Sequence, residues 1–300
     1  MLFMNKFGAG ILLFIQFAML TAAETKVTIL YSNNTNGLIE NCHCPEHAYG
    51  ALEKRAAIID SIRHSTPNVL LFDAGDLLDI RKNRILHSYI LQAYGIMGYD
   101  AWTCGDQDFI EGNDFFDRMA HNSRMLLLCS NVQQHGDPVG SPFLVKNFDS
   151  LRIGISGTIN PDLKKYLEKE SKTAYQFTQQ QSALQSVMKE LKSRCDYIIL
   201  LSHSGYDQDI IIAQWFPMIN IIIGGHSQTL LVNADRRDET YIVQCGENGY
   251  RLGVLSLHFI NKKLVSLQNK LMLLDDKIGN YPAVMELINS YHQQVMRKKF

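Results

Sequence analysis

The sequence predicts an α/β protein, because short apolar runs of strand length alternate with longer segments that carry apolar residues at helical spacing. The runs are unbroken and rich in β-branched residues, which suits strands buried on both faces. They are KVTILYS (26–32), NVLLFDA (68–74), RMLLLCS (124–130), LRIGIS (151–156), DYIILLS (196–202) and NIIIG (220–224). The helical segments are residues 51–63, 83–98 and 180–194.

The C-terminal part has a different pattern. Residues 251–260 and 263–274 alternate apolar and polar positions around a short polar turn, which predicts an antiparallel hairpin. A final helix is expected after Tyr281, with Pro282 in its first turn. In the first expected helix, Arg55 and Arg63 are expected to be solvated.

The composition is that of an ordinary globular protein, with 46% hydrophobic and 20% charged residues in a chain of 300. We expect one large domain over residues 24–300. The net charge of -1 gives no long-range attraction to a polyanion. We therefore expect no nucleic-acid partner.

The first 23 residues predict a secretory signal peptide. Lys6 is the only charge, and the small residues Thr21, Ala22 and Ala23 suit cleavage. The apolar core between them is about 14 residues long, whereas a spanning helix needs roughly 20. We therefore expect a secreted or periplasmic protein without a stable membrane anchor; the alternative is an uncleaved N-terminal anchor.

Six cysteines lie in the expected mature chain, where an oxidising compartment would allow disulfides to persist. Fifteen pairings are open. The cysteines are Cys42, Cys44, Cys104, Cys129, Cys195 and Cys245.

The segment NCHCPEH (41–47) is a second candidate site, because it follows the first expected strand and precedes the first helix. Its thiols and imidazoles could bind a soft metal, or its two cysteines could form a redox pair. The alternative is that the cysteines form disulfides elsewhere or are inert. The residues concerned are Cys42, His43, Cys44 and His47.

Ionisable side chains follow four apolar segments at the point where each expected strand ends. They are Asp76, Asp106, His203 and His226. Loops at the carboxyl ends of parallel strands converge on one crevice, and carboxylates with imidazoles are ligands for Zn, Mn or Fe. We expect one divalent ion per chain at this place. The alternative is a hydrogen-bonded network of the same four residues without metal.

These strand ends also carry a resemblance to a known family. Seven segments match it in order and spacing: VTILYSNNTNG, YGALEKRAAIID, LLFDAGDLLD, GYDAWTCGDQDF, IILLSHSGYDQD, INIIIGGHSQT and IVQCGENGYRLG. Over roughly residues 26–275 the chain resembles the N-terminal domain of the 5'-nucleotidase branch of the calcineurin-like metallophosphoesterases. The resemblance implies a four-layer α/β/β/α sandwich with a two-metal site at the strand ends.

The chain departs from the family on one side of that site. The resemblance implies metal ligands at Asp76, Asp106, His203 and His226, of which Asp106 replaces an Asn. At the family's other ligand positions stand the amides Asn34, Asn36 and Gln228. Gln107 replaces the catalytic His. The resemblance therefore implies one retained metal site and one emptied site.

A degenerate site of this kind predicts weak or altered hydrolysis of phosphate esters. A lost general acid alone commonly costs ~10²- to 10⁴-fold in rate. The first alternative is an inactive member that binds a small phosphorylated molecule or a protein partner; the second is redox or metal handling through Cys42 and Cys44. Family members with nucleotidase activity usually carry a C-terminal nucleoside-binding domain, which we do not expect within residues 24–300.

Overall fold

The computed structural model describes residues 23–43, 48–122 and 125–298. The expected signal peptide, apart from Ala23, lies outside the described residues, as do Cys44 and His47. Within the described part of the chain, no helix combines the length and the apolar character needed to cross a membrane.

The first of two large sheets has six strands in the order β15-β14-β1-β2-β3-β4. Strands β1 to β4 run parallel to one another, and the C-terminal hairpin adds β14 antiparallel to β1. The strands are β1 (Glu24–Ser32), β2 (Val69–Asp73), β3 (Ala101–Trp102), β4 (Leu126–Leu127), β14 (Arg251–Ile260) and β15 (Lys263–Leu273).

The second large sheet has the order β12-β13-β11-β10-β8-β7, with parallel strands in the centre and antiparallel strands at both edges. Its strands are β7 (Phe143–Phe148), β8 (Leu151–Ile159), β10 (Tyr197–His203), β11 (Ile221–Gly224), β12 (Asp235–Arg237) and β13 (Thr240–Val243). A small third sheet consists of β5 (Val132–Gln134), β6 (Asp137–Pro138) and β9 (Tyr175–Phe177).

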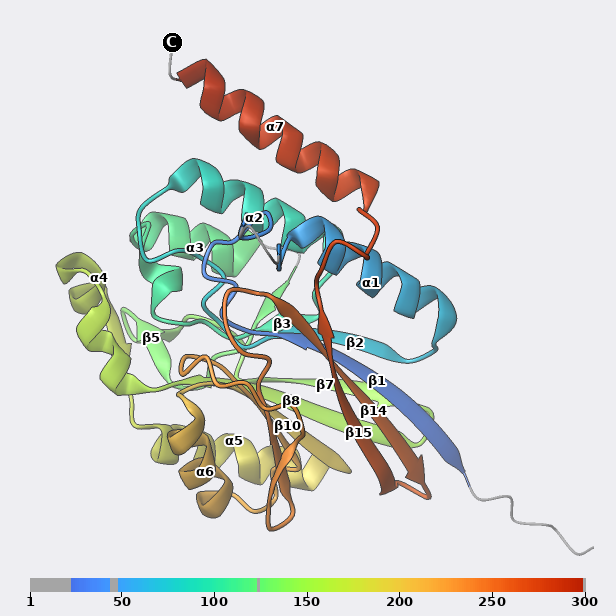
Figure 1. The fold of residues 1–300 in the computed structure, drawn as a ribbon. Helices are drawn as coiled ribbons and strands as arrows, with labels where there is room; N and C mark the ends of the chain where they lie inside the picture. Colours follow the sequence, from blue (N-terminus) through green and yellow to red (C-terminus); the bar gives the residue numbers. More distant parts are fainter. Residues whose placement is uncertain (1–22, 44–47, 123–124, 299–300) are drawn as a thin grey trace, which may run out of the picture.

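Helices cover the outer faces of both large sheets (Figure 1). On the first sheet lie α1 (Leu52–Ser65), α2 (Arg84–Met97) and α3 (Asn113–Asn122), and α7 (Pro282–Lys298) packs on the outside of α1 and α2. On the second sheet lie α5 (Gln180–Arg194) and α6 (Tyr206–Trp215). The remaining short elements are α4 (Lys169–Ala174) and the 3₁₀ turns η1 (Gln107–Phe109) and η2 (Pro161–Tyr166).

Three apolar cores separate the four layers. Strand residues alternate between them, as a period of two requires. In β10, Ile199 belongs to the core between the sheets, while its neighbour Ile198 packs under α5 and α6. In the first sheet, Ile29 and Leu30 divide in the same way between the central core and the helices. This arrangement is the four-layer α/β/β/α sandwich that the resemblance implies.

Local patterns predicted most elements well, and α5 has the bounds that its apolar spacing indicates. The run 124–130 is an exception, because only Leu126–Leu127 form a strand among its described residues, 125–130. Beyond this point the backbone turns to other partners: Cys129 N–H donates to Ser141 and Ser130 N–H to Gly157 in β8.

Arg55 is not solvated, which corrects the prediction from the sequence. Its side chain is 1% exposed. The guanidinium donates to the Tyr94 hydroxyl at 2.9 Å and to Thr35 Oγ1 at 3.0 Å, and the Tyr94 hydroxyl donates in turn to Asp73 at 3.0 Å. A buried charge requires partners, and these hydrogen bonds supply them. They also connect α1 and α2 to Thr35, which follows β1. Arg63 is exposed, as expected.

Candidate metal centre

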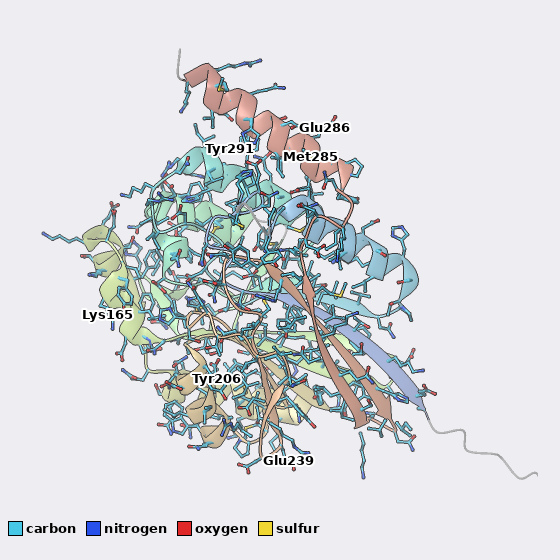
Figure 2. The ribbon with its side chains drawn as sticks, viewed as in Figure 1. Lys165, Tyr206, Glu239, Met285, Glu286 and Tyr291 are labelled. Atoms are coloured by element: carbon cyan, nitrogen blue, oxygen red, sulfur yellow. The ribbon has the colours of Figure 1, made fainter. Side chains whose placement is uncertain are left out.

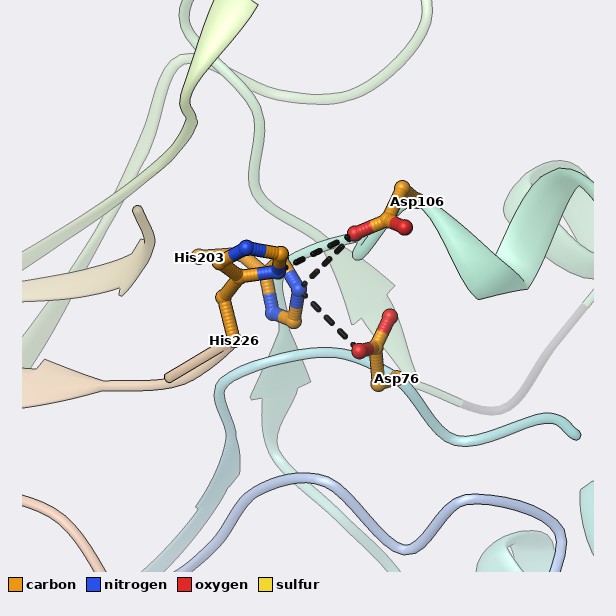
Figure 3. A group of neighbouring side chains, drawn as sticks. All are labelled: Asp76, Asp106, His203 and His226. Atoms are coloured by element: carbon orange, nitrogen blue, oxygen red, sulfur yellow. Dashed lines mark ion pairs between the residues drawn. The ribbon is translucent and has the colours of Figure 1, made fainter. Parts of the chain in front are cut away.

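The four residues that follow the strand ends meet in one place (Figure 3). Asp76 and Asp106 come from loops after β2 and β3 of the first sheet, while His203 ends β10 and His226 follows β11 of the second. One ligand atom from each lies within 4.8 Å of all the others. The site thus forms where the carboxyl ends of both sheets converge.

Two glycines allow these loops to approach one another. A Cβ on Gly75 would lie 2.6 Å from His203 Nδ1, and a Cβ on Gly225 would collide with the carbonyl oxygen of Ala74. The residues that follow these glycines, Asp76 and His226, have left-handed φ angles of 57° and 69°. Such angles are uncommon for residues with a side chain and often occur at functional sites.

His203 presents one ring nitrogen to the centre. Its Nδ1 lies 2.7 Å from the carbonyl oxygen of Ala74. Because that oxygen can only accept, Nδ1 carries a proton, and Nε2 is the ring atom that faces the centre. Nε2 lies 3.3 Å from Asp76 Oδ2 and 3.5 Å from Asp106 Oδ1. A histidine oriented by a backbone carbonyl in this way is typical of metal ligands.

The centre leaves buried polar atoms without hydrogen bonds. Among the described residues, His203 Nε2, Asp106 Oδ1 and Gln107 Oε1 are such atoms. An unsatisfied buried polar group costs about 1–3 kcal/mol, and more when it is charged. A divalent cation would satisfy the two ligand atoms, and two carboxylates with two imidazoles suit Zn, Mn or Fe. The residues present therefore fit an ion.

The charges at the centre reinforce this fit. Burial raises the pKa of Asp106, but the imidazoles of His203 and His226 close to its carboxylate outweigh burial and lower it overall. His226 Nδ1 lies 3.3 Å from Asp106 Oδ1. Asp106 is therefore a carboxylate at neutral pH, as a metal ligand must be. That these residues hold an ion stays a prediction.

Asn34 and Asn36, two of the three amides at positions where the resemblance implies lost metal ligands, are engaged in hydrogen bonds. Asn34 Oδ1 accepts the His226 backbone N–H at 2.9 Å. Gln107 Nε2 donates to Asp76 Oδ2 at 2.9 Å and to Asn36 Oδ1 at 3.2 Å. A neutral amide nitrogen thus lies between two oxygens on the side where the resemblance implies a second ion. Gln228 is exposed.

Asp108 is a residue of the site that the sequence did not reveal. Its carboxylate accepts four backbone N–H groups: Leu77 at 2.9 Å and Leu78 at 3.2 Å on one oxygen, Asp76 at 3.1 Å and Gly105 at 2.8 Å on the other. It therefore fixes the loop of Asp76 to the loop of Asp106. Its place two residues after Asp106 was the one available signal.

The structure does not describe the second candidate site in full. Cys42 is partly buried and His43 is exposed in the loop between β1 and α1, and the other two residues lie outside the described part. Metal or redox chemistry at this loop stays a prediction.

An exposed aromatic ring stands beside the centre. The ring centroid of Tyr166, at the end of η2, lies 6.5 Å from that of His226. Tyr166 is 61% exposed. Lys165, labelled in Figure 2, places its ammonium 4.9 Å from the same ring. A ligand bound at the centre would therefore have an aromatic face nearby.

Comparisons with known proteins agree with the fold. No protein-family model matches the chain. A curated 5'-nucleotidase from Diplobatis ommata is 26% identical over an alignment of 321 positions, which covers 93% of this chain and 54% of the relative. The chain thus spans about half the length of that relative.

Solved structures superpose over most of the chain. The 5'-nucleotidase precursor from Thermus thermophilus gives a TM-score of 0.79 at 21% identity, covering 91% of this chain and 59% of that one. The calcineurin-like phosphoesterase YfkN from Bacillus subtilis gives 0.78 at 19% identity, covering 92% and 99%. The layered fold is therefore shared with both.

Proposed function

We propose that this chain, a sequence relative of the 5'-nucleotidases with the calcineurin-like metallophosphoesterase fold, is an exported protein that holds one divalent ion and hydrolyses phosphate esters weakly. The observation that carries the proposal is the convergence of Asp76, Asp106, His203 and His226 within 4.8 Å. Export is supported by the apolar N-terminal segment and by the precursor form of the Thermus relative.

When bound, a divalent ion supplies positive charge for phosphoryl oxygens and acidifies a water molecule. The chain's own residues would do the rest. His203 would donate its Nε2 lone pair because its Nδ1 proton is held by Ala74, and Asp108 would keep both aspartate loops in place. Tyr166, whose ring lies beside His226, would contact a phosphate ester at the rim.

Weak activity follows from Gln107. Its amide cannot deliver a proton to a leaving group, so a contribution of ~10²- to 10⁴-fold from general acid catalysis is absent. Its Nε2 also fills the space between Asp76 and Asn36. Both effects reduce turnover by a two-metal mechanism.

The test combines metal analysis with an assay of 4-nitrophenyl phosphate hydrolysis with added Mn²⁺. We expect about one ion per chain and slow turnover, both lost on Asp76→Ala and His226→Ala. The matched control is His258→Ala, because the His258 side chain is 31% exposed and that of His226 is 30% exposed. His258 pairs with Lys26 at the opposite end of β1 and should leave both readouts unchanged. A wild-type protein without the ion would refute the proposal.

A second function is favoured by the lack of a proton donor at Gln107. A site that holds an ion but lacks a proton donor can bind a phosphorylated molecule or a protein partner without turnover. An intact ion with no measurable hydrolysis would support this alternative. Loss of metal only on Cys42→Ser would instead support metal handling by the loop after β1.

A further inference from the structure

Cys104 and Cys129 lie side by side where β3 and β4 end. The register of the two parallel strands pairs Ala101 with Leu126 and Trp102 with Leu127. Cys104 and Cys129 each lie two residues beyond these strands, and their sulfur atoms are 4.0 Å apart. Both residues are buried in the core between the first sheet and its helices.

The backbone geometry suits a cross-link. The strands from which the two cysteines extend lie about 4.8 Å apart, and disulfides span Cα separations of roughly 4.4–6.8 Å. Cys104 and Cys129 pack in the same core as Trp102 and Leu127. Rotation of the two side chains would bring the sulfurs from 4.0 Å toward the bonding distance of about 2.05 Å.

Two other described cysteines lie in different cores. Cys245 belongs to the core between the sheets, where its thiol contacts Asn33 Oδ1 at 2.8 Å. Cys195 packs with α5 on the outer face of the second sheet. A sheet separates each of them from Cys104 and Cys129, so neither competes for this pairing in the folded chain.

We propose that Cys104 and Cys129 form a disulfide in the exported protein, a proposal that rests on the proposed export. The two thiols lose two protons and two electrons as the Sγ–Sγ bond forms. A small disulfide such as oxidised glutathione, or the disulfide of an exported thiol oxidoreductase, accepts them and is reduced to two thiols.

The disulfide would stabilise the edge of the first sheet at β4. Strand β4 is joined to β3 by two residue pairs and by the Leu128 N–H bond to Trp102. The disulfide would close residues 104–129 into a loop and fix the chain two residues before Asp106. Reduction is expected to lower Tm by about 5–10 °C, from the closure of a loop of this length in a chain of this size.

Trypsin provides a direct test, because it separates the two cysteines into peptides 85–118 and 125–146. The full chain is exported in a bacterial host, purified without reductant, alkylated under denaturing conditions and digested. We expect the two peptides joined, with a mass about 2 Da below their sum, since two hydrogens are lost. Cys245→Ser should keep this species and Cys129→Ser should abolish it. Recovery of both peptides separately and fully alkylated would overturn the proposal.

A second arm separates failure of export from failure of the pairing. Folded chain purified from the reducing cytosol is equilibrated with excess oxidised glutathione and mapped in the same way. The joined peptides are expected here too, even if residues 1–23 remain uncleaved in the first arm. Glutathione on either thiol in place of the joined peptides would overturn the pairing.

Discussion

Asp108→Asn tests how the two aspartate loops of the centre are held together. The Asp108 carboxylate accepts four backbone N–H groups, two on each oxygen. An asparagine of the same shape accepts on one oxygen only, and its amide nitrogen would face two N–H groups. Burial and repulsion from Asp76 raise the pKa of Asp108 to about 8, so its hydrogen bonds are not counted as bonds to a full charge. Each buried N–H group left without an acceptor costs about 1–3 kcal/mol, so losing two acceptor contacts should lower the free energy of unfolding by about 2–6 kcal/mol.

The assay is urea unfolding followed by circular dichroism, with EDTA present so that metal binding does not contribute to stability. The control is Asp149→Asn, because Asp149 is exposed in the turn between β7 and β8, and it should change stability by about 0.5 kcal/mol or less. A loss below about 1 kcal/mol for Asp108→Asn would show that the four contacts do not stabilise the loops as argued.

Three further predictions follow from the same structure. Arg55→Met should destabilise the protein by about 3–5 kcal/mol in urea unfolding, because it leaves the buried Asp73 without its cation; a change as small as that of an exposed arginine would contradict the buried network. A combined variant restores the residues that the resemblance implies: Asn34→Asp, Asn36→His, Gln107→His and Gln228→His. It should raise the metal content from about one to about two ions per chain and increase hydrolysis by at least ~10²-fold; an unchanged number of ions per chain would contradict the assignment of the emptied site. Tyr166→Ala should weaken binding of phenylphosphonate about 5- to 10-fold, measured by calorimetry, and leave methylphosphonate unaffected, because only the aryl group can contact the ring; equal effects on both ligands would argue against a stacking role.

The sequence was sufficient for features that local pattern encodes. The apolar spacing of residues 180–194 predicted α5 with its observed bounds, and Pro282 correctly marked the start of α7. The four ionisable residues were found because each follows a strand, and parallel strands bring their carboxyl ends to one edge.

Features that depend on distant partners were not visible in the sequence. Arg55 has the spacing of a solvent-facing helix residue, yet Thr35 and two tyrosines surround its guanidinium. Asp108 could have been an ordinary turn residue, since its four N–H partners come from two separate loops. The shortness of β4 likewise reflects hydrogen bonds to Ser141 and Gly157, which no local pattern encodes.

The most direct test of the metal centre is anomalous diffraction from crystals of the mature protein grown with Mn²⁺. We predict one anomalous peak per chain, about 2.0–2.3 Å from Nε2 of His203 and from ligand atoms of Asp76, Asp106 and His226. Absence of a peak at this position, or a peak held instead by Asn34, Asn36 and Gln228, would contradict the account.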